Sequence, residues 1–261
     1  MKKLLAAVAV FSVISPARAQ TGQALDPLAT RPGWEVGGQI AQYHYEEPNF
    51  AKLTGFRGGF VGAYTFMWPN HMFLRIDGRE SYGALEYQGS GTKDSVPDLI
   101  LEARGVAGMD FRAGSISLSP YLGLGYRYLY DDLRGYSSTG AAGYRRYSNY
   151  LYVPVGLTMR FDLGSHWVFA PNAEVDIFIQ GKQKSLLSDA NLGFNDVTNT
   201  QKHGSGYRAY LMLENGHLAF GPWIHYWNIK DSDLQPIGGG QVGLEPENWT
   251  REIGFELRYR F

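Results

Sequence analysis

The chain has 261 residues, no cysteine, a formal net charge of -1 and 15% aromatic side chains. A charge this close to zero offers no basic surface for nucleic acid, and the missing thiols exclude disulfides, thiolate metal ligands and a cysteine nucleophile. The length suits one large all-β domain. The mean hydropathy of -0.27 is typical of strands with one apolar and one polar face.

The first 19 residues have the pattern of a cleavable secretory signal peptide. Lys2 and Lys3 precede an apolar run at residues 4–14, and residues 17–19, Ala-Arg-Ala, form a small-x-small cleavage box. The apolar run is shorter than the roughly 20 residues that a membrane-spanning helix needs. We therefore expect export, with residues 20–33 as a periplasmic lead-in and residues 34–261 as the folded domain.

Ten segments with alternating apolar and polar residues follow, each long enough for a tilted membrane strand. They lie near Trp34–Tyr45, Thr54–Phe66, His71–Tyr87, Asp98–Phe111, Ile116–Tyr130, Tyr147–Leu163, Trp167–Gly181, Gly206–Leu213, Leu218–Ile229 and Thr250–Phe261. A helix-free membrane protein must close its sheet, because unpaired backbone groups cannot be left in lipid. The pattern therefore predicts an up-and-down antiparallel transmembrane β-barrel of ten strands, with eight strands as the alternative. An even number places both termini in the periplasm.

The connections between these segments alternate in length. Tight links rich in turn residues occur at 68–70, 112–115, 164–166 and 214–217, and we expect them on the periplasmic side. Longer links are predicted to face outward, at Glu46–Leu53, Gln88–Pro97, Asp131–Arg146, Lys182–Ser205 and Lys230–Trp249.

The last segment alternates up to a terminal aromatic residue. Phe255, Leu257, Tyr259 and Phe261 are separated by Glu256, Arg258 and Arg260. This segment resembles the closing strand of Gram-negative outer-membrane barrels. The resemblance implies an outer-membrane location, with the four apolar residues as the signal that the barrel-insertion machinery recognises.

The two faces of the strands differ in charge. One face is apolar and should contact lipid between aromatic girdles at the strand ends. The other carries both signs, for example Glu35, Arg57, Arg127 and Arg208. Unpaired charges cannot be buried cheaply, so we expect arginine–carboxylate networks that plug a narrow lumen. The predicted network consists of Arg75, Asp77, Arg79, Glu102, Arg104, Glu174 and Asp176.

Catalytic signatures are weak. An omptin-like enzyme would need Asp pairs and an Asp–His couple, for which Asp131, Asp132, Asp231, Asp233 and His203 are the candidates. A lipolytic enzyme could use His44 or His225, but neither has a serine two residues further on. The six histidines lack metal-ligand spacing. We therefore assign no catalytic residue, cofactor or metal.

Several stretches resemble a group of proteobacterial outer-membrane β-barrel proteins of unassigned function. They include Gly33-Trp34-Glu35-Val36-Gly37, Asp131-Asp132-Leu133-Arg134-Gly135, residues 195–200 and Trp227-Asn228-Ile229. The resemblance implies fold and location and carries over no catalytic residue. The leading hypothesis is a monomeric envelope protein whose outward loops contact surface ligands or lipopolysaccharide. A narrow channel for small solutes or ions is the alternative, and an omptin-like or lipolytic enzyme the second.

Overall fold

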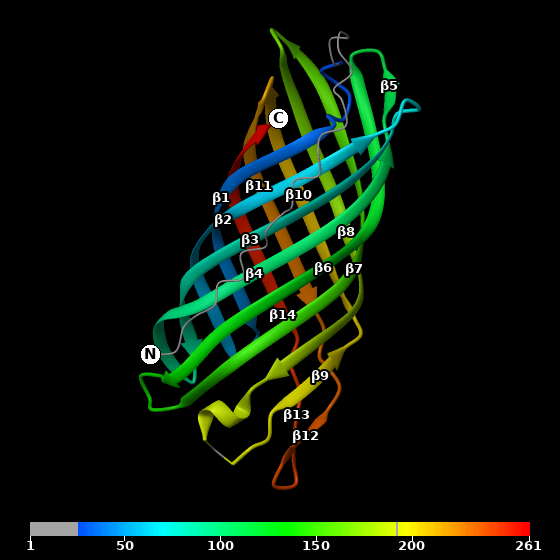
Figure 1. The fold of residues 1–261 in the computed structure, drawn as a ribbon. Coiled ribbons are helices and arrows are strands. Elements are labelled where there is room, and N and C mark those ends of the chain that lie inside the picture. The colour runs from blue at the N-terminus through cyan, green and yellow to red at the C-terminus, as the bar shows by residue number, and fades with distance from the viewer. Residues whose placement is uncertain (1–25, 192) are drawn as a thin grey trace.

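The computed structural model describes residues 26–191 and 193–261, and these residues form a closed antiparallel barrel (Figure 1). Its sheet has twelve strands, of which two, β5 (Phe111–Ala113) and β9 (Val197–Gln201), are short extensions. The other ten are β1 (Gly33–Glu47), β2 (Ala51–Met67), β3 (Met72–Gly89), β4 (Gly91–Met109), β6 (Ile116–Tyr136), β7 (Ala142–Gly164), β8 (Trp167–Ser185), β10 (Gly204–Asn215), β11 (Leu218–Ile229) and β14 (Asn248–Arg260). The predicted ten-stranded barrel is confirmed, whereas the predicted signal peptide lies outside the described residues.

Each long strand pairs with its neighbours in chain order, and the pairing of β14 with β1 closes the ring. One end of the barrel carries the four short turns and is here called the turn end. The start of β1 lies there beside the end of β14, and the Phe261 amide donates a hydrogen bond to the Trp34 carbonyl. The turn end lies at the top of Figure 1, and the opposite loop end, with β9, β12 (Gln235–Gly238) and β13 (Gln241–Gly243), lies at the bottom.

Three of the five long links predicted at the loop end are short in the structure. Only residues 48–50, Ser90 and residues 137–141 separate the paired strands there. The strands instead run on, to 21 residues in β6 and 23 in β7, although roughly 9–11 residues cross a bilayer. Pairing continues because β-bulges at Leu85/Tyr87 and Asp132/Gly135 absorb irregular residues without ending the ladder. The other two links contain a 3-10 turn, η1 (Leu187–Ala190), and the β12–β13 hairpin.

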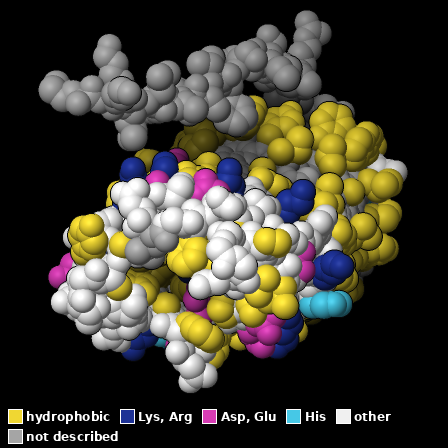
Figure 2. All heavy atoms as spheres, turned by 90° about the horizontal axis from the view of Figure 1, so that it is seen from below, with side chains coloured by type: hydrophobic (Ala, Val, Ile, Leu, Met, Phe, Trp, Pro, Cys, Tyr) yellow, Lys and Arg dark blue, Asp and Glu magenta, His cyan; other side chains and the backbone are white. Residues whose placement is uncertain are grey.

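Apolar side chains cover the outside of the barrel wall. Ile76, Leu122 and Ile177 are 60%, 62% and 54% exposed and belong to the face that the sequence assigned to lipid. Viewed from the loop end, hydrophobic side chains line the flank of the wall, whereas the facing surface mixes charged and polar groups (Figure 2). No helix among the described residues is long and apolar enough to cross a membrane.

Aromatic side chains form two girdles around this apolar wall. At the turn end, paired rings include Trp34–Tyr64, Phe66–Trp68, Trp167–Phe220 and Tyr259–Phe261. Towards the loop end they include Tyr128–Tyr147, Tyr207–Tyr226 and Tyr226–Trp249. On β1, Trp34 lies in the first girdle and His44 stacks on Trp249 of the second. This separation of about ten residues matches one tilted membrane crossing.

The described part of the lead-in, residues 26–32, enters the turn end of the barrel and is here called the strap. Leu28 is buried, and Thr30 donates from its amide and hydroxyl to the Asp110 carboxylate at 2.7 and 2.8 Å. Arg31 donates to the Gly216 carbonyl across the opening. The strap therefore caps the interior.

Candidate functional site in the barrel interior

Charged side chains fill the barrel interior in three connected layers. The alternation of each strand places them there, because residues two apart share a face. We call the groups around Glu35, Arg208 and Arg146 the turn-end, middle and loop-end layers.

In the turn-end layer, Glu35 on β1 receives three arginines. Arg75 lies 2.6 Å from its carboxylate, Arg260 2.9 Å and Arg258 3.5 Å. Arg260 also binds Glu214 at 2.7 Å. The carboxylate of Glu35 is 7% exposed, so its charge is balanced by neighbours instead of by bulk water.

The middle layer is organised by Arg208 on β10. Its guanidinium lies 2.5 Å from Glu102, 3.1 Å from Glu174 and 2.7 Å from Asp176. It also donates to the Tyr152 hydroxyl at 2.8 Å, and its side chain is 1% exposed. One arginine therefore contacts carboxylates from strands β4 and β8 across the barrel.

Further arginines connect the layers. Arg104 bridges Asp77 at 2.9 Å and Glu174 at 2.6 Å. Arg79 bridges Glu102 at 2.7 Å and Glu252 at 2.8 Å. Each arginine serves two carboxylates, so removal of one charge affects several partners.

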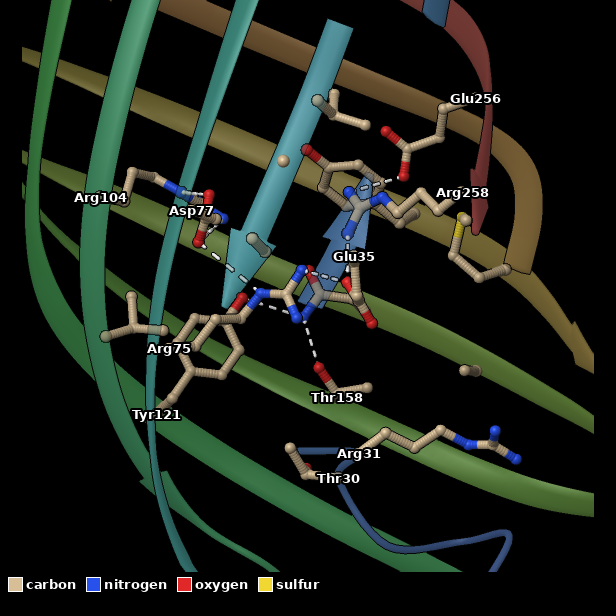
Figure 3. Close-up of a pocket in the computed structure, with 18 of the residues that line it drawn as sticks. Thr30, Arg31, Glu35, Arg75, Asp77, Arg104, Tyr121, Thr158, Glu256 and Arg258 are labelled. Atoms are coloured by element: carbon tan, nitrogen blue, oxygen red, sulfur yellow. Dashed lines mark hydrogen bonds and ion pairs between the residues drawn. The ribbon is translucent and has the colours of Figure 1, made fainter. Parts of the chain in front are cut away.

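The structure places all seven residues of the predicted network in this interior and in contact with its ion pairs. Figure 3 shows Arg75 between Glu35 and Asp77, with Arg104 on the other side of Asp77. The network also includes Glu252, which the sequence analysis did not identify. Glu252 lies an even number of residues before Glu256, Arg258 and Arg260 on β14, so strand alternation places it on the same face, and this spacing could have identified it.

The loop-end layer contains two further arginines. Arg57 contacts Asp98, with both side chains almost fully buried, and its guanidinium carbon lies 3.4 Å from the centre of the Tyr43 ring. Arg146 lies 2.6 Å from Glu47 and also contacts Glu245. Asp98, Arg146 and Glu47 fell inside or beside segments that the sequence reading assigned to loops, and therefore escaped notice.

An apolar cluster occupies the same half of the lumen. Its buried members are Tyr43, Tyr45, Leu53, Leu85, Val96, Ile100, Leu129, Leu133, Tyr150, Tyr152, Phe178, Trp227 and Ile229. Trp227 packs edge-on to Tyr152 with ring centres 5.0 Å apart, and Arg127 lies over its ring. These side chains pack together in this half of the lumen.

The turn-end half holds a cavity of about 150 Å³. Figure 3 shows its wall, with Thr30 and Arg31 of the strap on one side and the Glu35–Arg75 and Arg258–Glu256 pairs on the other. At about 30 Å³ per liquid water, this space holds roughly five water molecules.

The carboxylates considered for catalysis are held by partners other than a histidine. Asp132 binds Arg134 at 2.5 Å, and Asp233 accepts the Thr200 amide at 2.6 Å. Asp231 accepts the Glu247 amide, and Asp131 is buried beside Arg146. Within residues 26–191 and 193–261, no hydrogen bond joins the His203 side chain to any of these carboxylates.

The two strand histidines also have other partners. His44 lies 3.0 Å from Glu46 and stacks on Trp249 in the loop-end girdle. His225 is buried in the lumen, with its Nε2 atom 2.6 Å from the Tyr210 hydroxyl. In the part of the chain that the structure describes, no group of three His, Asp or Glu side chains could hold a metal ion.

Glu245 gives the loop end a predicted pH dependence. It lies between β13 and β14, where burial raises the pKa of its carboxyl to about 7 although Arg146 opposes the shift, and Glu47 and Asp131 raise it further. The pKa of a glutamate in an unfolded chain is near 4.3. Between about pH 4.3 and 7 the folded chain therefore holds a proton on Glu245 that the unfolded chain has lost. The contribution of this group to stability is therefore fully present below about pH 4.3 and is lost as pH rises through about 7.

Between pH 5 and 8 we expect a loss of about 2.5 kcal/mol, which should be absent in Glu245→Gln because that side chain stays neutral. Urea midpoints of both folded proteins in micelles between pH 5 and 8 measure it. Parallel pH profiles of the two proteins would contradict the assignment to Glu245.

Comparison with known proteins shows similarity of fold. No family model matches the chain, and no curated protein matches it. Among solved structures, the outer membrane protease OmpT from Escherichia coli is 9% identical, with a TM-score of 0.51, covering 87% of this chain and 96% of that one. The outer membrane protein OprG from Pseudomonas aeruginosa is 12% identical, with a TM-score of 0.46, covering 90% of this chain and 100% of the other. Neisserial surface protein A is 11% identical, with a TM-score of 0.38, covering 88% and 97%.

The class defined by fold and interior is thus a closed, ten-stranded barrel of the outer-membrane type with a buried charge network.

Proposed function

We propose that this protein is a non-conducting barrel of the bacterial outer membrane that contacts lipopolysaccharide around its outer rim. The turn end then faces the periplasm and the loop end faces outward. The apolar wall between two aromatic girdles supports the membrane location.

The filled lumen is the observation that carries the non-conducting part of the proposal. Trp227, Tyr152 and Arg127 are each at most 1% exposed in the middle of the barrel. Charges of both signs are paired around them, whereas a charge-selective pore favours one sign on its wall. A narrow channel is therefore the less favoured alternative.

Exposed cations beside the loop-end girdle support contact with anionic headgroups. Lys184 lies opposite Tyr147 in the sheet, and Arg251 lies opposite Tyr226. Both are exposed and form no ion pair within the described residues. Basic side chains next to interfacial aromatics attract phosphorylated lipid headgroups.

The part of the barrel beyond this girdle forms a rigid outer surface. Ser137 and Thr139 of the β6–β7 link donate to the Ser90 carbonyl at 2.6 and 2.8 Å, which ties this link to the β3–β4 turn. The exposed rings of Phe50, in the β1–β2 link, and Tyr136, at the end of β6, belong to this outer surface. Such a preformed surface suits recognition of external ligands.

Binding of the refolded barrel to lipopolysaccharide in nanodiscs tests the proposal. The double variant Lys184→Gln/Arg251→Gln should bind at least about tenfold more weakly, with a reduced salt dependence. Arg134→Gln is the matched control, because Arg134 is already paired with Asp132. Equal binding by the double variant and the control, or equal binding to discs without lipopolysaccharide, would overturn the proposal.

Proteolysis, the activity for which the OmpT protease is named, is not proposed for this chain. General-base activation of water requires a base within hydrogen-bond reach. Asp132 is held by Arg134, and the His203 side chain has no carboxylate partner among the described residues.

A further inference from the structure

The turn-end cavity is lined by more arginines than carboxylates. Eight arginines face five acidic residues, namely Arg31, Arg75, Arg79, Arg104, Arg160, Arg208, Arg258 and Arg260 against Glu35, Asp77, Glu102, Glu214 and Glu256. Three of these arginines, Arg79, Arg104 and Arg208, have further buried carboxylate partners in Glu252, Glu174 and Asp176, which makes the two signs equal in number. The site is therefore distinguished by how unevenly its arginines are paired.

Two arginines at the cavity have no carboxylate partner within the described residues. Arg160 on β7 donates to the Ser119 hydroxyl at 2.9 Å, and Arg31 in the strap donates to the Gly216 carbonyl. Neither forms an ion pair. Each cation therefore donates directly to a neutral acceptor, although the Ser119 hydroxyl in turn donates to Asp110 at 2.6 Å.

A third arginine is only partly satisfied. Arg260 shares Glu35 with Arg75 and Arg258, and its Nη1 atom is buried without a hydrogen-bond acceptor, as is the Nε atom of Arg31. Burial and the nearby Arg260 charge lower the pKa of Arg31, whereas Glu214 and Glu35 oppose the shift. The three arginines all line the same cavity, with Glu214 among them.

A buried donor without an acceptor is costly, because it has lost its hydration, and an anion shared by the Arg31 Nε and Arg260 Nη1 atoms would remove that cost. Guanidinium groups bind oxyanions through paired hydrogen bonds. Three guanidinium groups from the strap, β7 and β14 approach from different elements, which suits a tetrahedral oxyanion better than a planar carboxylate. The cavity volume of about 150 Å³ is enough for such an ion with little remaining water.

We propose that this cavity binds a small tetrahedral oxyanion of the phosphate class through Arg31, Arg160 and Arg260. Because Arg31 belongs to the strap and the other two to the wall, the anion joins the strap to the barrel. Occupancy of the site therefore tightens the cap at the turn end. This site lies at the opposite end from the cations assigned to lipopolysaccharide, and it does not depend on that assignment.

Titration of the refolded full chain in micelles with inorganic phosphate tests the site. We expect a saturable rise in melting temperature, absent with potassium chloride at equal ionic strength. Arg160→Gln should weaken phosphate binding at least about tenfold. Arg31→Gln, in the strap outside the barrel strands, should do the same and provides the test if the β7 variant does not fold.

The matched control is Arg134→Gln, which removes an exposed, already paired arginine at the loop end and should leave the phosphate response unchanged. Glycerol phosphate distinguishes the source of the ligand: a response equal to that of phosphate indicates a headgroup-type monoester, and a response to phosphate alone indicates the free ion. Equal shifts with chloride or acetate, or an unchanged response in both arginine variants, would overturn the proposal.

Amide hydrogen exchange tests the link to the strap. Phosphate should slow exchange at residues 27–31 in the unmodified chain and have no such effect in Arg31→Gln. If phosphate binds but exchange in the strap is unchanged in both proteins, the bridging role of Arg31 is wrong.

Discussion

Replacement of Arg208 with alanine should lower the free energy of unfolding by about 3 to 5 kcal/mol. Arg208 is the shared partner of Glu102, Glu174 and Asp176, with its own side chain 1% exposed. Without it, three neighbouring carboxylates remain in a poorly hydrated interior and repel one another. Urea unfolding in lipid and the heat-dependent shift of the folded band on a gel measure the loss.

Arg134→Ala is the control for this variant, since it also removes one arginine. Arg134 pairs with Asp132, but its side chain is 52% exposed. An exposed ion pair contributes about 0 to 1 kcal/mol. Equal stability of the Arg208 and Arg134 variants would show that the interior charges are hydrated and that the network is not buried in solution.

The second large effect is expected at Asp98, the partner of Arg57. Asp98→Ala leaves the Arg57 guanidinium fully buried against the face of Tyr43 and without its ion-pair partner, which should cost about 3 to 5 kcal/mol. The surrounding cluster is apolar and includes Ile100, two residues after Asp98 on β4. Urea unfolding again provides the measurement.

A double variant separates lost attraction from a stranded charge. Arg57→Met/Asp98→Leu replaces the buried pair with apolar side chains of similar size, which is often neutral or stabilising. We therefore expect it to recover most of the stability lost in Asp98→Ala. If the double variant is as unstable as the single one, the loss arises from packing and not from the unpaired cation.

The strand count and wall orientation could be predicted because alternation is a local property. Leu122, Ile177 and Ile76 point outward as their register requires. The length by which the strands extend beyond the membrane could not be predicted. Val96 and Pro97 fall in a predicted link, yet they pair with Leu85 and Ala84 inside β3–β4 because the nearby bulge restores the register.

The sequence predicts which charged residues face the barrel interior, but it does not predict which of them form ion pairs with one another. Register shows that Glu102 and Arg208 face inward, whereas their contact joins residues 106 positions apart across the barrel. That contact depends on the relative heights of β4 and β10, which arise from strand tilt and stagger. The same limit explains why the partners of Arg146 and the role of the strap were not foreseen.

Planar-bilayer recording of the refolded chain tests the closed interior most directly. The paired charges and the cluster around Trp227 predict that bilayers containing verified folded barrel show no conductance steps. Stepwise conductance that is altered by Arg75→Ala or Arg104→Ala would contradict a closed lumen and favour a narrow channel.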